Sequence, residues 1–264
     1  MTKQSNRYQQ LIEKIFFDNY KKGKKEVSFH RHDFESSAKE LNLKLPKNLG
    51  DVVYSIRYRT KLPDSILATQ SKGMEWIIEG AGRAKYSFKL VKVNRIIPNP
   101  DLITIKIPDS TPEIVSQYSL SDEQALLAKI RYNRLIDIFL GLTTYSLQNH
   151  LRTTVKLVGQ IEIDEMYVGI DERGRHFVMP VQAKGGSDQL SVVQTSQDIK
   201  CCTEKYPNLI CRAISAQFMD DDLIALFELI VQDDQIKVVQ ERHYKLVPGK
   251  SISDADLKQY QNIS

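Results

Sequence analysis

The chain has 264 residues, 41% of them apolar, which is enough for one large or two modest domains with a buried core. Its three cysteines, Cys201, Cys202 and Cys211, form neither a disulfide framework nor a repeated Cys-x-x-Cys zinc pattern, so a reducing cytosol is expected. The start MTKQSNRYQQ lacks the apolar stretch of a signal peptide, and no run of about 18 uncharged apolar residues occurs. We therefore expect a soluble, cytoplasmic protein, neither secreted nor membrane-embedded.

The net charge of +4 conceals a strong asymmetry along the chain. Residues 1–100 contain 20 Lys and Arg against 10 Asp and Glu, whereas residues 101–264 contain 17 against 23. A basic segment of this size attracts polyanions because its binding releases their counterions, and DNA or RNA is the usual partner. The alternative is a Lys-rich surface that only faces water.

Apolar spacing in residues 1–95 predicts three helices followed by a β-hairpin. The helical segments are residues 8–20, 32–42 and 48–59. Asp33 is expected to cap the second helix, and Pro46 separates it from the third. Residues 74–93 alternate on either side of the turn GAGR, which predicts two paired strands. Three helices followed by a hairpin is the order of a winged helix-turn-helix domain.

The third predicted helix and the hairpin carry the candidate DNA-binding residues. In helix-turn-helix folds the second helix of the motif enters the major groove, and neighbouring cations hold phosphates. The candidates are Tyr54, Ser55, Arg57, Tyr58, Arg59, Lys61, Arg83 and Lys85. The alternative is a small helical domain whose basic helix only faces water.

Residues 96–118 are rich in Pro and Asp, which predicts a linker with one short strand before a second domain over 119–264. A helix is predicted over 121–141, ending at Gly141, and a further helix over 145–159. Two strands joined by the turn DERGR follow, then an amphipathic helix, a strand and an apolar segment that suits either a helix or a strand. This order predicts a mixed α/β (α+β) core.

Two neighbouring strands carry the residues suited to phosphodiester chemistry. In IEIDEMYV, the two-residue period puts Glu162 and Asp164 on one face and Glu165 on the other. In PVQAKGG the same two-residue period puts Gln182 and Lys184 on one face of the strand. If the strands pair through the DERGR turn, Asp164 faces these two residues. Phosphodiester hydrolysis needs oxygen ligands for a hard cation, a polarised water and a positive group, which Asp164, Gln182 and Lys184 offer.

This arrangement resembles the PD-(D/E)XK nuclease superfamily, with Ile163-Asp164 as the first half-motif and Gln182-Ala183-Lys184 as the second. The stretches QNHLRTTVKLVGQIEIDEMYVG, PVQAKGGSDQLSVVQTSQD and LPKNLGDVVYSIRYRTKLP also resemble type II restriction endonucleases. The resemblance implies a restriction-endonuclease-like mixed-sheet core and Mg²⁺-dependent, sequence-specific cleavage of double-stranded DNA. A homodimer is expected because symmetric DNA sites match two-fold proteins, and a cognate DNA methyltransferase would be a further partner.

Residue by residue, the resemblance implies that Asp164 binds Mg²⁺, that Gln182 is a second ligand, and that Lys184 orients or activates the attacking water. The backbone carbonyl of Ala183 is a further implied ligand. The chain departs from the family pattern in two places, since no proline precedes Asp164 and neutral Gln182 stands where an acid is usual. The candidates for an added acidic ligand are Glu162 first, then Glu165 and Glu123.

Two other functions fit parts of the same pattern. The charge asymmetry suits a winged-helix transcriptional regulator whose second domain dimerises or binds a ligand without cleaving DNA. A degenerate nuclease fold with a structural role would explain the neutral residue at position 182. Cleavage that requires a divalent metal separates the nuclease from both.

Overall fold

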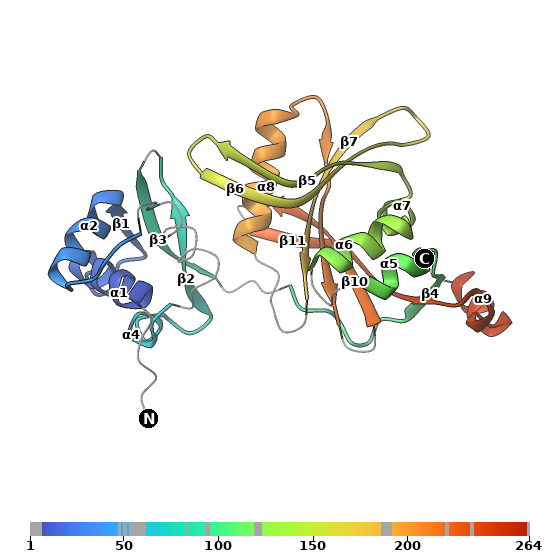
Figure 1. Cartoon of the computed structure of the whole chain (residues 1–264), viewed down its shortest axis with the longest axis horizontal. Coiled ribbons are helices and arrows are strands. Elements are labelled where there is room, and N and C mark those ends of the chain that lie inside the picture. Colours follow the sequence, from blue (N-terminus) through green and yellow to red (C-terminus); the bar gives the residue numbers. More distant parts are fainter. Residues whose placement is uncertain are drawn as a thin grey trace. The chain divides into compact units, whose positions relative to one another are not determined.

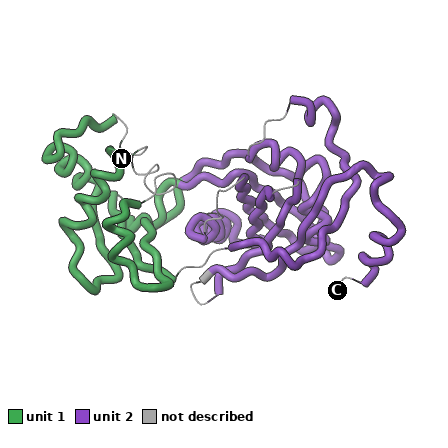
Figure 2. Tube along the Cα trace, turned by 90° about the horizontal axis from the view of Figure 1, so that it is seen from below, with its two compact units in different colours: residues 1–93, 154–160 green, residues 94–153, 161–264 purple. Residues whose placement is uncertain are grey.

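The computed structural model divides the chain into two compact units, coloured in Figure 2: residues 1–93 with 154–160, and residues 94–153 with 161–264. The structure describes residues 7–46, 49, 52, 62–82, 84–92, 96–118, 123–185, 192–219, 222–232 and 235–262. Within these ranges, no helix has both the length and the apolar composition that crossing a membrane requires.

Unit 1 combines short helices with a three-stranded antiparallel sheet (Figure 1). Its elements are α1 (Arg7–Asn19), β1 (Glu26–His30), α2 (Arg31–Glu40), α4 (Asp64–Leu67), β2 (Met74–Gly80) and β3 (Lys85–Lys92). The strand order is β1-β3-β2. The expected hairpin is formed by β2 and β3, which pair in register from Met74 opposite Lys92 to Gly80 opposite Tyr86.

An aromatic core holds unit 1 together. In α1 the apolar residues recur three and four positions apart, so Ile12, Ile15 and Phe16 share the buried face. The ring of Phe16 meets Trp76 and Phe88 edge-on, with centroids 5.2 Å and 4.9 Å away. Each such ring pair adds about 0.5–1.5 kcal/mol beyond the burial of its surface.

Two features of unit 1 differ from the sequence-based expectation. Strand β1 is not predicted, because its two-residue alternation of buried Val27 and Phe29 follows directly on a run of lysines. Asp33 is also not the cap of α2. The helix begins at Arg31, and the Asp33 carboxylate accepts a hydrogen bond from the backbone N–H of His30, the capping position, at 2.6 Å.

Unit 2 is built on an eight-stranded mixed sheet (Figure 1). Its strands are β4 (Thr104–Pro108), β5 (Thr143–Val155), β6 (Gly159–Ile170), β7 (His176–Lys184), β8 (Ile210–Cys211), β9 (Ala213–Phe218), β10 (Leu223–Gln232) and β11 (Gln235–Val247). Their order is β4-β11-β10-β9-β7-β6-β5, with β8 beside β7. Strand β6 is antiparallel to β7, whereas β9 runs parallel to β7. The described chain is therefore mixed α/β, as predicted.

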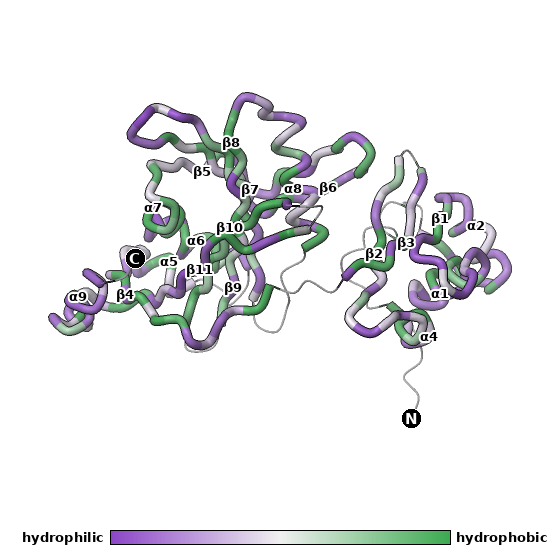
Figure 3. Tube along the Cα trace, turned by 180° about the vertical axis from the view of Figure 1, so that it is seen from behind, coloured by the Kyte–Doolittle hydropathy of each residue, from purple (hydrophilic) through white to green (hydrophobic). Residues whose placement is uncertain are grey.

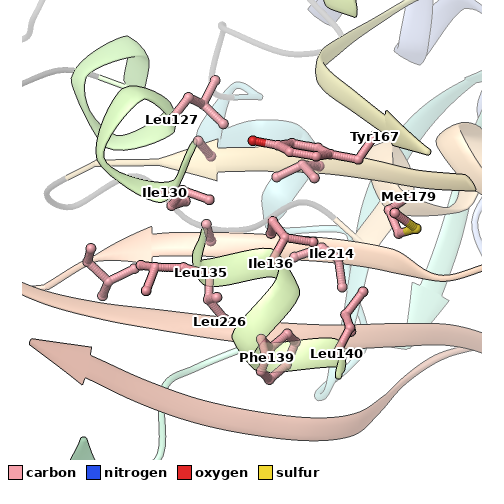
Figure 4. Close-up of a cluster of buried hydrophobic side chains, with 14 of the residues drawn as sticks. Leu127, Ile130, Leu135, Ile136, Phe139, Leu140, Tyr167, Met179, Ile214 and Leu226 are labelled. Carbon is pink, nitrogen blue, oxygen red and sulfur yellow. The ribbon is translucent and has the colours of Figure 1, made fainter. Parts of the chain in front are cut away.

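Helices cover both faces of this sheet. The helices of unit 2 are α5 (Glu113–Tyr118), α6 (Glu123–Tyr132), α7 (Leu135–Leu140), α8 (Val192–Lys205) and α9 (Asp254–Tyr260), with a 3₁₀ turn at Gly249–Ser251. Ile214 and Leu226 pack with the helical pair α6 and α7 (Figure 4), whereas their neighbours Ala213 and Phe227 pack with Ile199 of α8. Because successive strand residues point to opposite faces, the helical pair and α8 lie on opposite sides. Strand β10, covered on both sides, is hydrophobic along most of its length (Figure 3).

Two predictions for this part of the chain are wrong. The helix expected over 121–141 is interrupted, because Arg134 has a left-handed backbone with φ 51°, although α7 does end at Gly141. The segment 145–159 is not a helix but belongs to β5, the turn after it and the start of β6. Its leucines and valines, spaced four apart, imitate a helix, and pairing with β6 overrides this pattern. The one short strand expected within 96–118 is present as β4, and it pairs with β11 in the sheet.

Candidate functional site

The pairing of β6 with β7 brings the residues of the two half-motifs together. The antiparallel register sets Glu165 opposite Val181, and the Asp164 Oδ2 atom accepts a hydrogen bond from the Ala183 N–H at 3.0 Å. The two-residue period of both strands then puts Asp164 and Gln182 on the face of the sheet that α8 covers.

Lys184, the last residue of β7, connects this site to α6. Its Nζ donates to the Oε1 atom of Glu123 at 2.7 Å, and both side chains are partly exposed. Glu123 is the first residue of α6, where the helix dipole favours a carboxylate. The carboxylate of Glu123 on α6 is thus next to the end of β7, the strand that contains Gln182 and Lys184.

The environment of Asp164 disfavours its charge. Burial raises the pKa of the Asp164 carboxyl above its usual 3.8, and the negative charge of Glu123 raises it further. The Ala183 N–H and the positive charge of Lys184 act in the opposite direction. Carboxylates perturbed in this way are common in functional sites, because a bound cation relieves the cost of their ionisation.

Gln182 is buried rather than open to solvent. Its side chain is 1% exposed, and its Nε2 donates to the Oδ2 atom of Asp198 on α8 at 2.6 Å. Asp198 is also 1% exposed. Burial raises the pKa of the Asp198 carboxyl well above 3.8, against the effect of the bond from Gln182 and together with the charge of Asp164. Within the described residues, neither Gln182 Oε1 nor Asp198 Oδ1 has a hydrogen-bond partner.

Asp198 was not predicted from the sequence, although a local signal marks it. It lies three residues after Thr195 and four before Cys202, on the buried stripe of α8. An acidic residue at such a position needs either a partner or a function, because burying a charge alone is costly. The helix period therefore identifies Asp198 as unusual, but only the fold pairs it with Gln182.

The acids considered as added ligands occupy different places. Glu162 is held by β5, where His150 Nδ1 and Arg152 Nε lie 3.3 Å and 3.2 Å from its carboxylate oxygens. Glu165 is fully buried and accepts a bond from Arg131 Nε of α6 at 2.9 Å. Of the three acids, Glu123 is the one joined to Lys184 by an ion pair. Where the chain is described, no three His, Cys, Asp or Glu side chains are grouped to hold a metal ion.

Most predicted DNA-binding residues lie outside the described residues. These are Tyr54, Ser55, Arg57, Tyr58, Arg59, Lys61 and Arg83. Only Leu49 and Val52 of the third predicted helix are described, and both are helical. Lys85 is described, as the exposed first residue of β3. The turn between α1 and β1 also exposes Lys21, Lys22, Lys24 and Lys25.

The donor atoms around β7 fit a hard cation. Asp164 and Glu123 offer carboxylate oxygens and Gln182 an amide oxygen, which are ligands that Mg²⁺ accepts. Lys184 adds a positive group that could contact a phosphate or a water molecule. No protein-family model, no curated protein and no solved structure matches the chain.

Proposed function

We propose that the protein is a Mg²⁺-dependent endonuclease that cleaves double-stranded DNA at specific sequences, in the manner of type II restriction enzymes. The observation that carries the proposal is the pairing of Asp164 on β6 with the Gln182-Ala183-Lys184 end of β7. The two half-motifs of the PD-(D/E)XK resemblance are thus on adjacent strands. The ion pair between Lys184 and Glu123 adds a second carboxylate next to them.

Each residue has a defined role in this proposal. Asp164, Gln182 and Glu123 would hold the metal ion, with the backbone carbonyl of Ala183 as a further oxygen. The bound ion supplies the Lewis-acid polarisation of the phosphate. Lys184 orients the attacking water and stabilises negative charge on the phosphate. Glu123 pairs with the Lys184 ammonium group and holds it in place before DNA binds.

Unit 1 is the DNA-binding module in this proposal. Its helix, strand, helix and terminal hairpin suit a winged helix-turn-helix domain, with residues 48–59 as the helix that enters the major groove. The excess of basic residues in residues 1–100 would supply phosphate contacts and make binding sensitive to salt. A homodimer would match the symmetry of a palindromic site.

The test is cleavage of unmethylated plasmid or phage DNA by the purified chain, in Mg²⁺ and in EDTA. We expect discrete fragments that require the metal, and intact DNA with Asp164→Asn. Glu172→Gln is the matched control, because Glu172 is an exposed acid in the turn of the same hairpin and should be dispensable. Sequence-specific binding with no cleavage in Mg²⁺ or Mn²⁺ would refute the nuclease and favour a transcriptional regulator.

A further inference from the structure

We propose that Asp198 is a positioning residue that fixes the amide of Gln182 so that its oxygen, and not its nitrogen, faces the metal ion. The inference rests on the proposed nuclease function and assigns a role to a residue outside both half-motifs. Asp198 acts through Gln182 and does not itself contact the ion or the DNA.

The hydrogen bond between the two side chains sets the orientation. A glutamine amide has a donor end and an acceptor end, and here the Asp198 Oδ2 atom accepts the hydrogen bond from the donor end of Gln182. With Gln182 Nε2 2.6 Å from Asp198 Oδ2, the Oε1 atom is at the end of the amide that points away from this bond. Both side chains are buried, so water competes little with this bond.

The acceptor that this orientation creates has no partner in the described parts of the chain. Gln182 Oε1 is buried and unpaired, and leaving a buried acceptor unpaired costs about 1–3 kcal/mol. A cation bound beside Asp164 would pair with it. The Gln182 Oε1 atom is therefore free to bind a cation.

Asp198 also accounts for the neutral residue at position 182. A glutamate at position 182 would place its carboxylate about as close to that of Asp198 as the amide of Gln182 is now, at 2.6 Å. The carboxylate of Asp164 already acts on Asp198 in the same site. Like charges at such a distance do not ionise together. With glutamine on the strand and the acid on α8, the ligand oxygen is kept without this conflict.

The experiment measures Mn²⁺ binding to the full chain by electron paramagnetic resonance, in the absence of DNA. Asp198→Leu removes the acceptor and keeps the branched shape of the side chain, and we expect Mn²⁺ affinity to fall about 10–100-fold, as for other residues that orient metal ligands. Asp198→Asn keeps an acceptor oxygen and should stay within about threefold of the wild type. Cys201→Ala is the control, because Cys201 is a buried residue of the same helix outside the pair formed by Gln182 and Asp198.

A reciprocal exchange keeps the test valid if Asp198→Leu does not fold. Gln182→Glu alone should weaken folding or Mn²⁺ binding, and adding Asp198→Asn should restore both, because donor and acceptor are then exchanged. Wild-type Mn²⁺ affinity in Asp198→Leu, or no rescue in the double variant, would overturn the inference while leaving the nuclease proposal intact. A wild-type chain that neither binds Mn²⁺ nor cleaves DNA would overturn the nuclease proposal as well.

Discussion

Replacing Lys184 by methionine separates a catalytic role of its ammonium group from a structural one. Methionine keeps most of the aliphatic stem and removes the Nζ atom that donates to Glu123. Because the Glu123 side chain is 37% exposed and that of Lys184 18%, loss of this ion pair should cost at most about 1 kcal/mol of stability. A group that activates the attacking water contributes about 10²–10⁴-fold to the rate. We therefore expect cleavage to fall by that factor in a protein of nearly unchanged stability.

The assay pairs single-turnover cleavage of supercoiled plasmid in Mg²⁺ with urea unfolding followed by circular dichroism. Lys106→Met is the matched control, since Lys106 also forms a lysine–carboxylate ion pair, with Asp256 at 2.9 Å, outside the site. It should keep its cleavage rate. If Lys184→Met cleaves within about threefold of the wild type, Lys184 is not the catalytic cation. If both variants lose cleavage equally, the loss reflects folding and not chemistry.

The remaining predictions concern stability. Burial raises the pKa of Asp164 in the folded chain above its usual 3.8. Without metal, the folded chain therefore loses stability as the pH rises from below 3.8 through the higher folded pKa, and this loss of stability remains at neutral pH. Asp164→Asn should therefore melt above the wild type in EDTA at about pH 8 and not at about pH 3; equal melting at both would contradict this. Glu228→Ala leaves Arg212 without its bidentate partner and should lower the free energy of unfolding in urea by about 3 kcal/mol. A loss of less than about 1 kcal/mol would show that this pair contributes little to stability. Phe16→Ala removes the centre of the unit 1 core and should cost about 3–5 kcal/mol, read from the fluorescence of Trp76, whereas an unchanged midpoint would contradict the packing.

Elements with strong local signals were predictable from the sequence. Strand β6 begins with alternating residues, β7 is a nearly continuous apolar run, and the turn between them contains Gly174 at φ 72°, a conformation that suits glycine. The final apolar segment was ambiguous, because a continuous apolar run suits either a buried helix or a buried strand. Its identity as β10 depends on β9 and β11, which pair with it on both sides.

Elements decided by distant partners were not predictable in this way. Strand β5 carries helix-like spacing, and its conformation is fixed by β6. In the candidate site, too, some residues were predictable from local sequence and others depend on distant parts of the chain. The two-residue period finds Asp164, Gln182 and Lys184, but not the bond from Lys184 to Glu123, which lies 61 residues away in the sequence. Nor does it find the bond from Gln182 to Asp198, because the angle at which α8 crosses the sheet is a property of the whole fold.

The polar atoms buried beneath α8 are hard to explain by stability alone. Three of the six buried side-chain atoms without a partner in the described chain come from three neighbouring elements. They belong to Gln182 on β7, Asp198 on α8 and Ser215 on β9, where Ser215 is the strand partner of Gln182. Next to them, Ala183 and Ala216 show that the same strands accept small apolar side chains. A sheet selected only for stability would be expected to use such residues here too, because unpaired buried polar groups are costly. Their occurrence at one place, beside a carboxylate with a raised pKa, supports the proposed cation site.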